Sequence, residues 1–228
     1  MPTHSNYNYS LTQQIYTAAE IEEAGGGAGT ISSIAFYNGG STKTRNLSIY
    51  IVNTDKDSFS GATDWITASS SDLVFSGNVE MTAGGWKTIE LTNTFSYDGG
   101  NLAVIVDDNT NNYSYGMGCR YFIASSTQSL YYRNDNTNPD PTNPTVSGTP
   151  TTYKNQIVLD IEQTAVTCAK PKNFNAEGIT AHTATLTWTA GEAGQDAWNI
   201  EYKKSTESVW QSESVTTTRG FVSFFIGK

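Results

Sequence analysis

Oxygen-bearing side chains crowd one short stretch of the sequence. The segment VIVDDNTNNYSY, residues 104–115, passes from an apolar run into two aspartates and several asparagines. Calcium takes six to eight oxygens from carboxylates, amides and backbone carbonyls. Asp107, Asp108 and Asn109 are therefore candidate ligands of Ca²⁺. The alternative is a turn, because Asp and Asn also close strand ends through local hydrogen bonds.

Two other acidic segments raise the same question. Asp160 lies in the apolar segment IVLDI, which is similar to the acidic last strand of calcium-binding jelly rolls. It joins the candidate calcium ligands. The segment DKDSFSG, residues 55–61, resembles the start of an EF-hand loop. However, Phe59 stands at a ligand position and the distal glutamate is missing. We interpret this second segment as a turn.

The acidic residues and histidines do not form a recognisable catalytic arrangement. Adjacent strand residues point to opposite faces, so Asp107 and Asp108 are unsuited to act as a carboxylate pair on one substrate. The two histidines, His4 and His182, lie towards opposite ends of the chain, without a serine or cysteine context that suggests activation. The sequence therefore predicts a protein that is not an enzyme.

Tyrosines in polar surroundings form a second class of candidate binding residue. Tyr113, Tyr115 and Tyr132 stand beside loops, where their rings could stack on a sugar or anchor a protein partner. The alternative is that each ring caps a core, because tyrosine is a good strand residue.

Composition and charge narrow the class of protein. Charged residues make up 15% of the 228 residues, against roughly 25% in typical globular proteins. Thr, Ser, Asn, Gly and Tyr take their place, which favours strands and turns. Residues 1–165 hold 16 Asp/Glu and 7 Lys/Arg, whereas residues 166–228 hold six of each. An acidic first part disfavours nucleic acid as a partner, because phosphate contacts need a basic patch.

Membrane insertion is not expected, because no apolar run approaches about 18 residues. No signal peptide is visible at the start of the sequence. The chain is therefore interpreted as cytosolic or as a piece of a longer protein. Cys119 and Cys168 are the two cysteines, and the sequence leaves open whether they pair.

Short apolar segments alternate with turn signals along the first 165 residues. Residues 45–53 alternate cleanly between two faces, and residues 102–106 read as a strand buried on both faces. A helix is expected only near residues 17–24, a turn at residues 76–78, and a long loop over residues 134–150. The other strand candidates are residues 30–37, 73–75, 86–91 and 156–161. This pattern predicts an all-β jelly roll or sandwich.

The sequence after Cys168 resembles the first half of a fibronectin type III domain. The resemblance rests on CAKPKNFNAEGI from Cys168 onward, ATLTWT at residues 184–189 and AWNIEYK at residues 197–203. It implies that Trp188 and Tyr202 are core residues. The match covers about 45 residues and ends well short of the roughly 100 residues of such a sandwich. We therefore predict a jelly-roll domain at residues 1–165 and an incomplete fibronectin type III domain at residues 166–228.

The first domain resembles jelly-roll adhesin modules of Bacteroidota, of the gingipain-type haemagglutinin (cleaved adhesin) kind. The resemblance rests on LTQQIYTAAEI (residues 11–21), GTISSIAFY (29–37), TRNLSIYIVN (44–53), FSYDGGNL (95–102) and VDDNT (106–110). It implies a non-catalytic, exported adhesion module, often stabilised by calcium and followed by fibronectin type III repeats. It also implies structural positions for Trp65 and Trp86.

These observations predict an extracellular or cell-surface binding module within a longer multidomain chain. Loops around residues 107–115 and 131–144 would contact a host protein or glycan, and Ca²⁺ would hold the loops in shape. The alternative is a carbohydrate-binding module appended to a secreted glycan-degrading enzyme. A third possibility is a structural stalk with no ligand.

Overall fold

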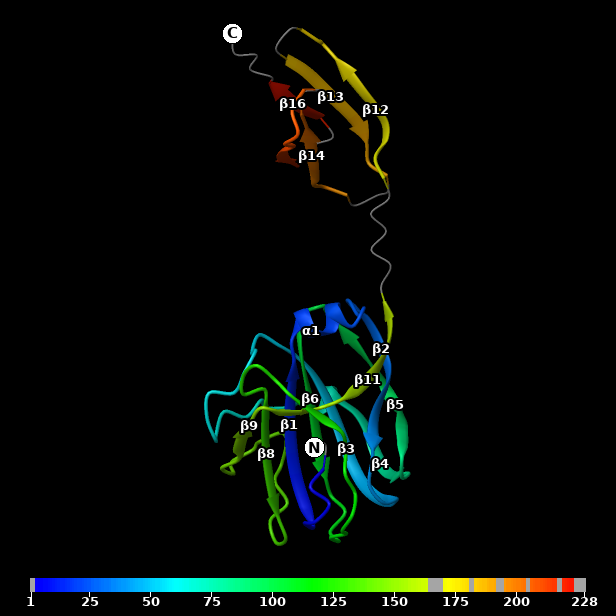
Figure 1. Ribbon diagram of the computed structural model, residues 1–228, viewed down its shortest axis with the longest axis vertical. Helices are drawn as coiled ribbons and strands as arrows, with labels where there is room; N and C mark the ends of the chain where they lie inside the picture. The colour runs from blue at the N-terminus through cyan, green and yellow to red at the C-terminus, as the bar shows by residue number, and fades with distance from the viewer. Residues whose placement is uncertain are drawn as a thin grey trace. The chain divides into compact units, whose positions relative to one another are not determined.

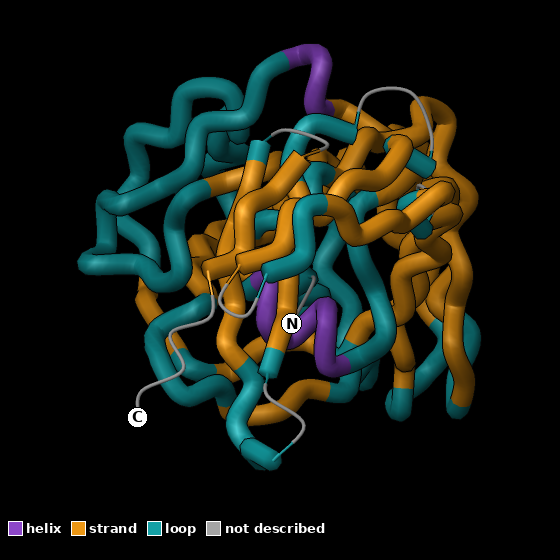
Figure 2. Tube along the Cα trace, turned by 90° about the horizontal axis from the view of Figure 1, so that it is seen from above, coloured by secondary structure: helices purple, strands orange, loops and turns teal. Residues whose placement is uncertain are grey.

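The computed structural model describes residues 3–163, 170–180, 183–191, 195–203, 206–216 and 219–223. The chain divides into two compact units, residues 1–164 and 165–228. Both are built almost wholly from antiparallel strands, and helix is confined to short segments (Figures 1 and 2), which confirms the all-β prediction. Within the described ranges, no helix is long and apolar enough to cross a membrane. Cys168 and His182 lie outside the described residues.

Three sheets make up the first unit (Figure 1). The largest has six strands in the order β4-β3-β6-β1-β8-β9, the second has three in the order β11-β2-β5, and the third pairs β10 with β7. The strand bounds are β1 Tyr9–Tyr16, β2 Gly29–Asn38, β3 Lys43–Thr54, β4 Leu73–Met81, β5 Gly85–Tyr97, β6 Asn101–Asp108, β7 Tyr121–Ile123, β8 Ser129–Asn134, β9 Thr149–Thr151, β10 Tyr153–Asn155 and β11 Ile157–Gln163.

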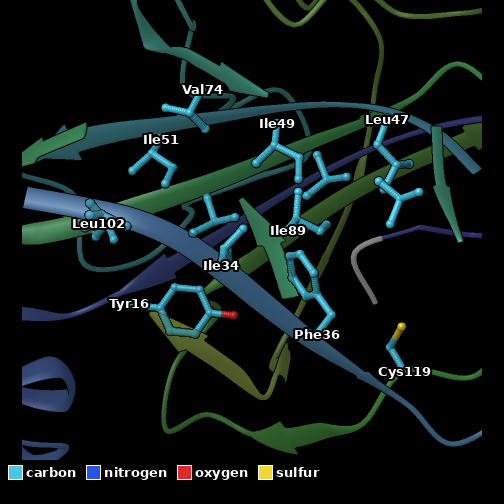
Figure 3. Close-up of a cluster of buried hydrophobic side chains, with 14 of the residues drawn as sticks. Tyr16, Ile34, Phe36, Leu47, Ile49, Ile51, Val74, Ile89, Leu102 and Cys119 are labelled. Atoms are coloured by element: carbon cyan, nitrogen blue, oxygen red, sulfur yellow. The ribbon is translucent and has the colours of Figure 1, made fainter. Parts of the chain in front are cut away.

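The main core lies between the six-stranded and three-stranded sheets. Leu47, Ile49 and Ile51 of β3 project into it together with Ile34 and Phe36 of β2 (Figure 3). All five side chains are buried. The alternation predicted for residues 45–53 is therefore confirmed, because Leu47, Ile49 and Ile51, which are two residues apart, all contribute to this core.

A second core covers the opposite face of the six-stranded sheet. Ala103 and Ile105 of β6 pack there with Trp65 and Leu130, beneath loops over residues 55–69 and 135–148. The Trp65 indole donates to the carbonyl of Val146 at 2.7 Å, which fastens one loop to the other. Strand β6 is thus buried on both faces, as its continuous apolar sequence predicts.

Two local expectations had different outcomes. Helix α1 (Ala18–Glu23) forms where it was predicted, and a capping box between Thr17 and Glu20 starts it. The turn expected at residues 76–78 is wrong, because β4 runs straight through this segment. There β4 pairs with β3 and places Val79 and Met81 in the main core. Pairing and burial outweigh the turn preference of Ser-Gly-Asn.

A buried lysine joins α1 to the sheets. Lys154 of β10 has no exposed surface, and its Nζ donates to Glu20 (2.6 Å), to the Gln128 side chain (2.6 Å) and to the Ile15 carbonyl (2.9 Å). The ammonium group also lies 4.8 Å from the ring centre of Tyr16. A buried charge with this many acceptors is stabilised only while all of them are present.

Replacing this lysine by an apolar residue of similar length should destabilise the first unit. We expect Lys154→Met to lower the free energy of unfolding by about 3 kcal/mol, because three buried or half-buried acceptors lose their donor. Urea unfolding at pH 7 measures the change, with the half-exposed Lys87→Met as the control. Equal stability of the two variants would show that the network contributes nothing net.

The described residues of the second unit form two small sheets. Strands β12 (Lys172–Glu177), β13 (Thr183–Thr189) and β16 (Arg219–Ser223) form one, and β14 (Trp198–Tyr202) and β15 (Gln211–Val215) form the other. Trp188 is buried and stands edge-on to Trp198, with ring centres 5.7 Å apart. Tyr202 is half-buried.

Candidate functional site

The two adjacent aspartates end strand β6 on opposite faces of the six-stranded sheet. Asp107 follows Ala103 and Ile105 on the side of the second core, whereas Asp108 follows Val104 and Val106 on the side of the main core. Both side chains are buried. The sequence prediction that they cannot serve as a catalytic pair on one substrate agrees with this geometry.

Asp108 forms a buried ion pair with Arg45 of β3. Both Nε and Nη2 of Arg45 lie 2.8 Å from Asp108 Oδ2, and the two side chains are at most 1% exposed. The other carboxylate oxygen accepts from the backbone and hydroxyl of Thr110, at 3.1 and 2.5 Å. Burial raises the pKa of Asp108 above its ordinary value, while Arg45 and Thr110 act in the opposite direction.

The same guanidinium holds two chain segments that lie over the sheet end. Nη1 of Arg45 donates to the carbonyl of Asn112 at 2.6 Å, and Nη2 donates to the carbonyl of Tyr7 at 3.2 Å. The N-terminal segment and the loop after β6 also bond to each other directly, from Ser114 N to Ser5 O at 2.6 Å. Arg45 therefore fixes the start of this loop.

The loop after β6, residues 109–118, carries two exposed aromatic rings. Tyr113 and Tyr115 are 54% and 68% exposed, and their ring centres lie 5.6 Å apart in an edge-to-face arrangement. Tyr132 is placed differently. It is half-buried on β8, opposite Leu11 of β1, and packs against the second core. The structure thus brings Tyr113 and Tyr115 together and leaves Tyr132 as part of the packing.

Asp107 has an unusual environment for a carboxylate. Its side chain is 5% exposed, and Oδ2 accepts from the Asn109 amide at 2.7 Å. The other oxygen, Oδ1, is buried and has no hydrogen-bond partner among the described residues. Burial, with smaller contributions from Asp108 and Asp140, raises the pKa of Asp107 to about 7. The group therefore binds a proton more readily than an exposed aspartate does.

The predicted calcium ligands do not converge on one point. Asp160 lies on the outer face of the other sheet, where its carboxylate accepts from Ser32 at 3.1 Å. Asp108 already faces Arg45. No three His, Cys, Asp or Glu side chains in the described part of the chain are grouped to hold a metal. A calcium site here would therefore use Asp107, with Asp140 as a second acid that acts on its charge, and amide or carbonyl oxygens, which Ca²⁺ accepts. The Asn109 side chain turns its amide nitrogen toward Asp107, and its oxygen accepts from Asn138.

Other candidate residues also find definite places. His4 is half-buried against Tyr131, with ring centres 4.3 Å apart, and desolvation lowers its pKa to about 3. Trp65 is buried as expected. The structural position expected for Trp86 is wrong, because this side chain is 46% exposed. Trp86 lies three residues before the core residue Ile89 in β5. The two side chains therefore lie on opposite faces of the sheet, and Trp86 points outward.

Sequence reasoning missed Arg45, the residue that organises this end of the sandwich. One signal was present. Arg45 is in phase with Leu47, Ile49 and Ile51, so the alternation that predicts those three in the core places Arg45 on the same face. A charge on a core face requires a buried partner, and Asp108 is the acid that supplies it.

Comparison with known proteins identified no relative of this chain. No protein-family model, curated protein or solved structure matches it.

Proposed function

We propose that this chain is a non-catalytic adhesion or binding module of a bacterial cell-surface or secreted multidomain protein. It binds a host protein or glycan through the loop after β6. One observation carries the proposal: the exposed pair Tyr113 and Tyr115 lies on a loop whose base is fixed by a buried ion pair. Tyrosine supplies contact area at low entropic cost, and rigid anchoring of its loop reduces the cost of binding further.

Two further elements belong to this proposal. The first unit is a jelly roll of the adhesin kind, and the second unit is a partial fibronectin type III domain. The sequence resemblances and the all-β architecture support both assignments. Ca²⁺ is bound at Asp107, supported by the partnerless buried oxygen of that side chain. When bound, the ion would cross-link the loop after β6 to the loop that contains Asp140.

The proposed site predicts that binding depends on the two tyrosines. We expect the full chain to bind at least one ligand in a panel of immobilised host matrix and plasma proteins and a glycan array. We expect Tyr113→Ala/Tyr115→Ala to weaken that binding at least tenfold, because the pair is the exposed apolar part of the loop. Surface plasmon resonance measures the dissociation constants.

The chain offers a matched control for this variant. Tyr121 and Tyr153 form another exposed edge-to-face pair, with ring centres 5.0 Å apart and about half of each side chain exposed. Removing this second pair should leave binding at the loop unchanged. If both double variants bind as the wild type does, the loop after β6 is not the binding site.

The alternative function, a carbohydrate-binding module of a secreted glycan-degrading enzyme, is favoured by a different observation. Trp86 is an exposed ring beside a cleft on the three-stranded sheet. Saturable binding of a glycan with no protein ligand would favour this alternative.

A further inference from the structure

On the outer face of the three-stranded sheet, small side chains of the central strand lie between larger side chains of the two flanking strands. In the central strand β2, Ala35 and Ser33 face outward and are flanked by β5 and β11. Thr88 and Val158 stand on either side of Ala35, and Glu90 and Asp160 stand on either side of Ser33. The flanking side chains are exposed, whereas those of Ala35 and Ser33 are not. The side chains of the two flanking strands are therefore more exposed on this face than the small side chains of β2 between them.

An aromatic ring lies at one end of this outer face, where β5 pairs with β2. Trp86 pairs across the strands with Tyr37, and the two rings meet edge-to-face with centres 5.6 Å apart. The Tyr37 ring is in turn covered by the guanidinium of Arg120, at 3.7 Å from the ring centre. The Tyr37 hydroxyl donates to the carbonyl of Gly84 at 3.2 Å. Trp86 thus rests on an ordered support while remaining 46% exposed.

A cleft of about 710 Å³ runs along β11 and is lined in part by Trp86 and Val158. Its exposed polar side chains are planar groups that hydrogen-bond in fixed directions, namely the amides of Gln156 and Gln163 and the carboxylate of Asp160. The only other charged side chain in the lining is Glu20, which is paired with Lys154. The cleft therefore offers acceptors and amide donors but no free positive charge.

We propose that this face binds a neutral oligosaccharide, whose sugar ring stacks on Trp86 and whose hydroxyls bond to Asp160 and the neighbouring amides. An exposed, supported indole beside planar polar groups matches a ligand with one apolar face and an equatorial rim of hydroxyls. The described lining of the cleft contains two carboxylates and no Lys or Arg side chain, which disfavours sulfated or carboxylated glycans there. The exposed guanidinium of Arg120 lies over Tyr37, next to Trp86 and outside this lining. The site lies on a different sheet from the tyrosine loop and does not depend on the function proposed there.

Affinity electrophoresis of the full chain tests this assignment. The gels contain, one at a time, four soluble neutral polysaccharides (xyloglucan, mixed-linkage β-glucan, galactomannan and yeast mannan) and two anionic ones (heparin and chondroitin sulfate). We expect retardation by at least one neutral polysaccharide and by neither anionic one. Trp86→Ala should weaken the retarding interaction at least tenfold, and Asp160→Asn should weaken it severalfold. Both residues are exposed, so both variants should keep the wild-type melting temperature.

The tyrosine variant Tyr113→Ala/Tyr115→Ala serves as the control, because its substitutions lie on the loop after β6. Retardation that survives in this control and is lost in Trp86→Ala supports the proposal. Three results overturn it: no retardation in any neutral gel, retardation by anionic polysaccharides alone, or retardation that Trp86→Ala leaves unchanged. If the tyrosine variant loses a protein ligand while none of the neutral gels retards the chain, the adhesion function stands and the sugar site does not.

Discussion

Arg45→Ala should lower the free energy of unfolding of the first unit by roughly 3–5 kcal/mol, the range typical for breaking one side of a buried ion pair. The substitution leaves Asp108 buried at 0% exposure without its counter-ion. It also removes the donors from the carbonyls of Asn112 and Tyr7. Urea unfolding at pH 7, followed by fluorescence, measures the change.

Two further variants separate the charge from the loop contacts. Lys43→Ala removes a half-exposed positive charge from the same strand and should cost less than about 0.5 kcal/mol. Arg45→Lys retains a charge for Asp108, but a single ammonium cannot reach the carbonyls in the way the guanidinium fork does. We expect it to recover part of the stability while amide hydrogen exchange in residues 109–116 stays faster than in the wild type. Wild-type stability in Arg45→Ala would show that the pair only compensates for its own desolvation.

The stability of this ion pair and the function of the loop are coupled. Tyr113 follows directly after Asn112, whose carbonyl accepts a hydrogen bond from Arg45, and Tyr115 lies two residues further along. A tyrosine pair on a loop without this anchor would have to be ordered when the ligand binds, at a cost in affinity. Arg45→Lys should therefore weaken ligand binding as well as loop protection, even though the arginine is buried and cannot touch a ligand.

Much of the fold could be predicted from the sequence because its signals are local. Residues 45–53 alternate strictly, residues 102–106 are continuously apolar, and Thr17 with Glu20 makes a capping box. Strand β1 was not identified, because Gln13 and Gln14 interrupt its apolar pattern. Both glutamines are buried and satisfied by distant partners, Gln13 by the backbone of Ile66 and Gln14 by Asn155. A polar residue whose partner lies tens of residues away leaves no local pattern.

The candidate site was harder to predict for the same reason. The acidic loop after β6 was identified from its composition, but the separate roles of Asp107 and Asp108 depend on what packs over each face of the sheet. Arg45 lies 63 residues before Asp108 in the chain. The grouping of Trp86 with Tyr37 and Arg120 likewise depends on β2 pairing with β5, which adjacency in the sequence does not encode.

Asp107 should make the first unit less stable as the pH rises from about 4 to 7 in the presence of chelator. Its pKa is about 7 in the folded protein against 3.8 ordinarily, so the folded state binds the extra proton across this interval. The contribution to stability is complete below about pH 4 and is lost as the pH rises through 7, at up to about 1.4 kcal/mol per pH unit. His4 contributes with the opposite sign, because its pKa of about 3 favours the neutral form of the folded state. The wild type must therefore be compared with Asp107→Asn, which retains His4.

The difference in unfolding free energy between Asp107→Asn and the wild type should grow with pH in chelator by several kcal/mol in total.

Calcium should reverse this trend. A cation at Asp107 needs the ionised carboxylate, so adding 5 mM Ca²⁺ should stabilise the wild type at pH 8, have little effect at pH 5, and have no effect on Asp107→Asn. Differential scanning calorimetry of both proteins at both pH values, with and without Ca²⁺, measures these changes in stability. A calcium effect of equal size in the wild type and in Asp107→Asn would remove Asp107 from any metal site. A pH dependence that is identical in the two proteins would show that the buried carboxylate titrates normally and that solvent reaches its partnerless oxygen.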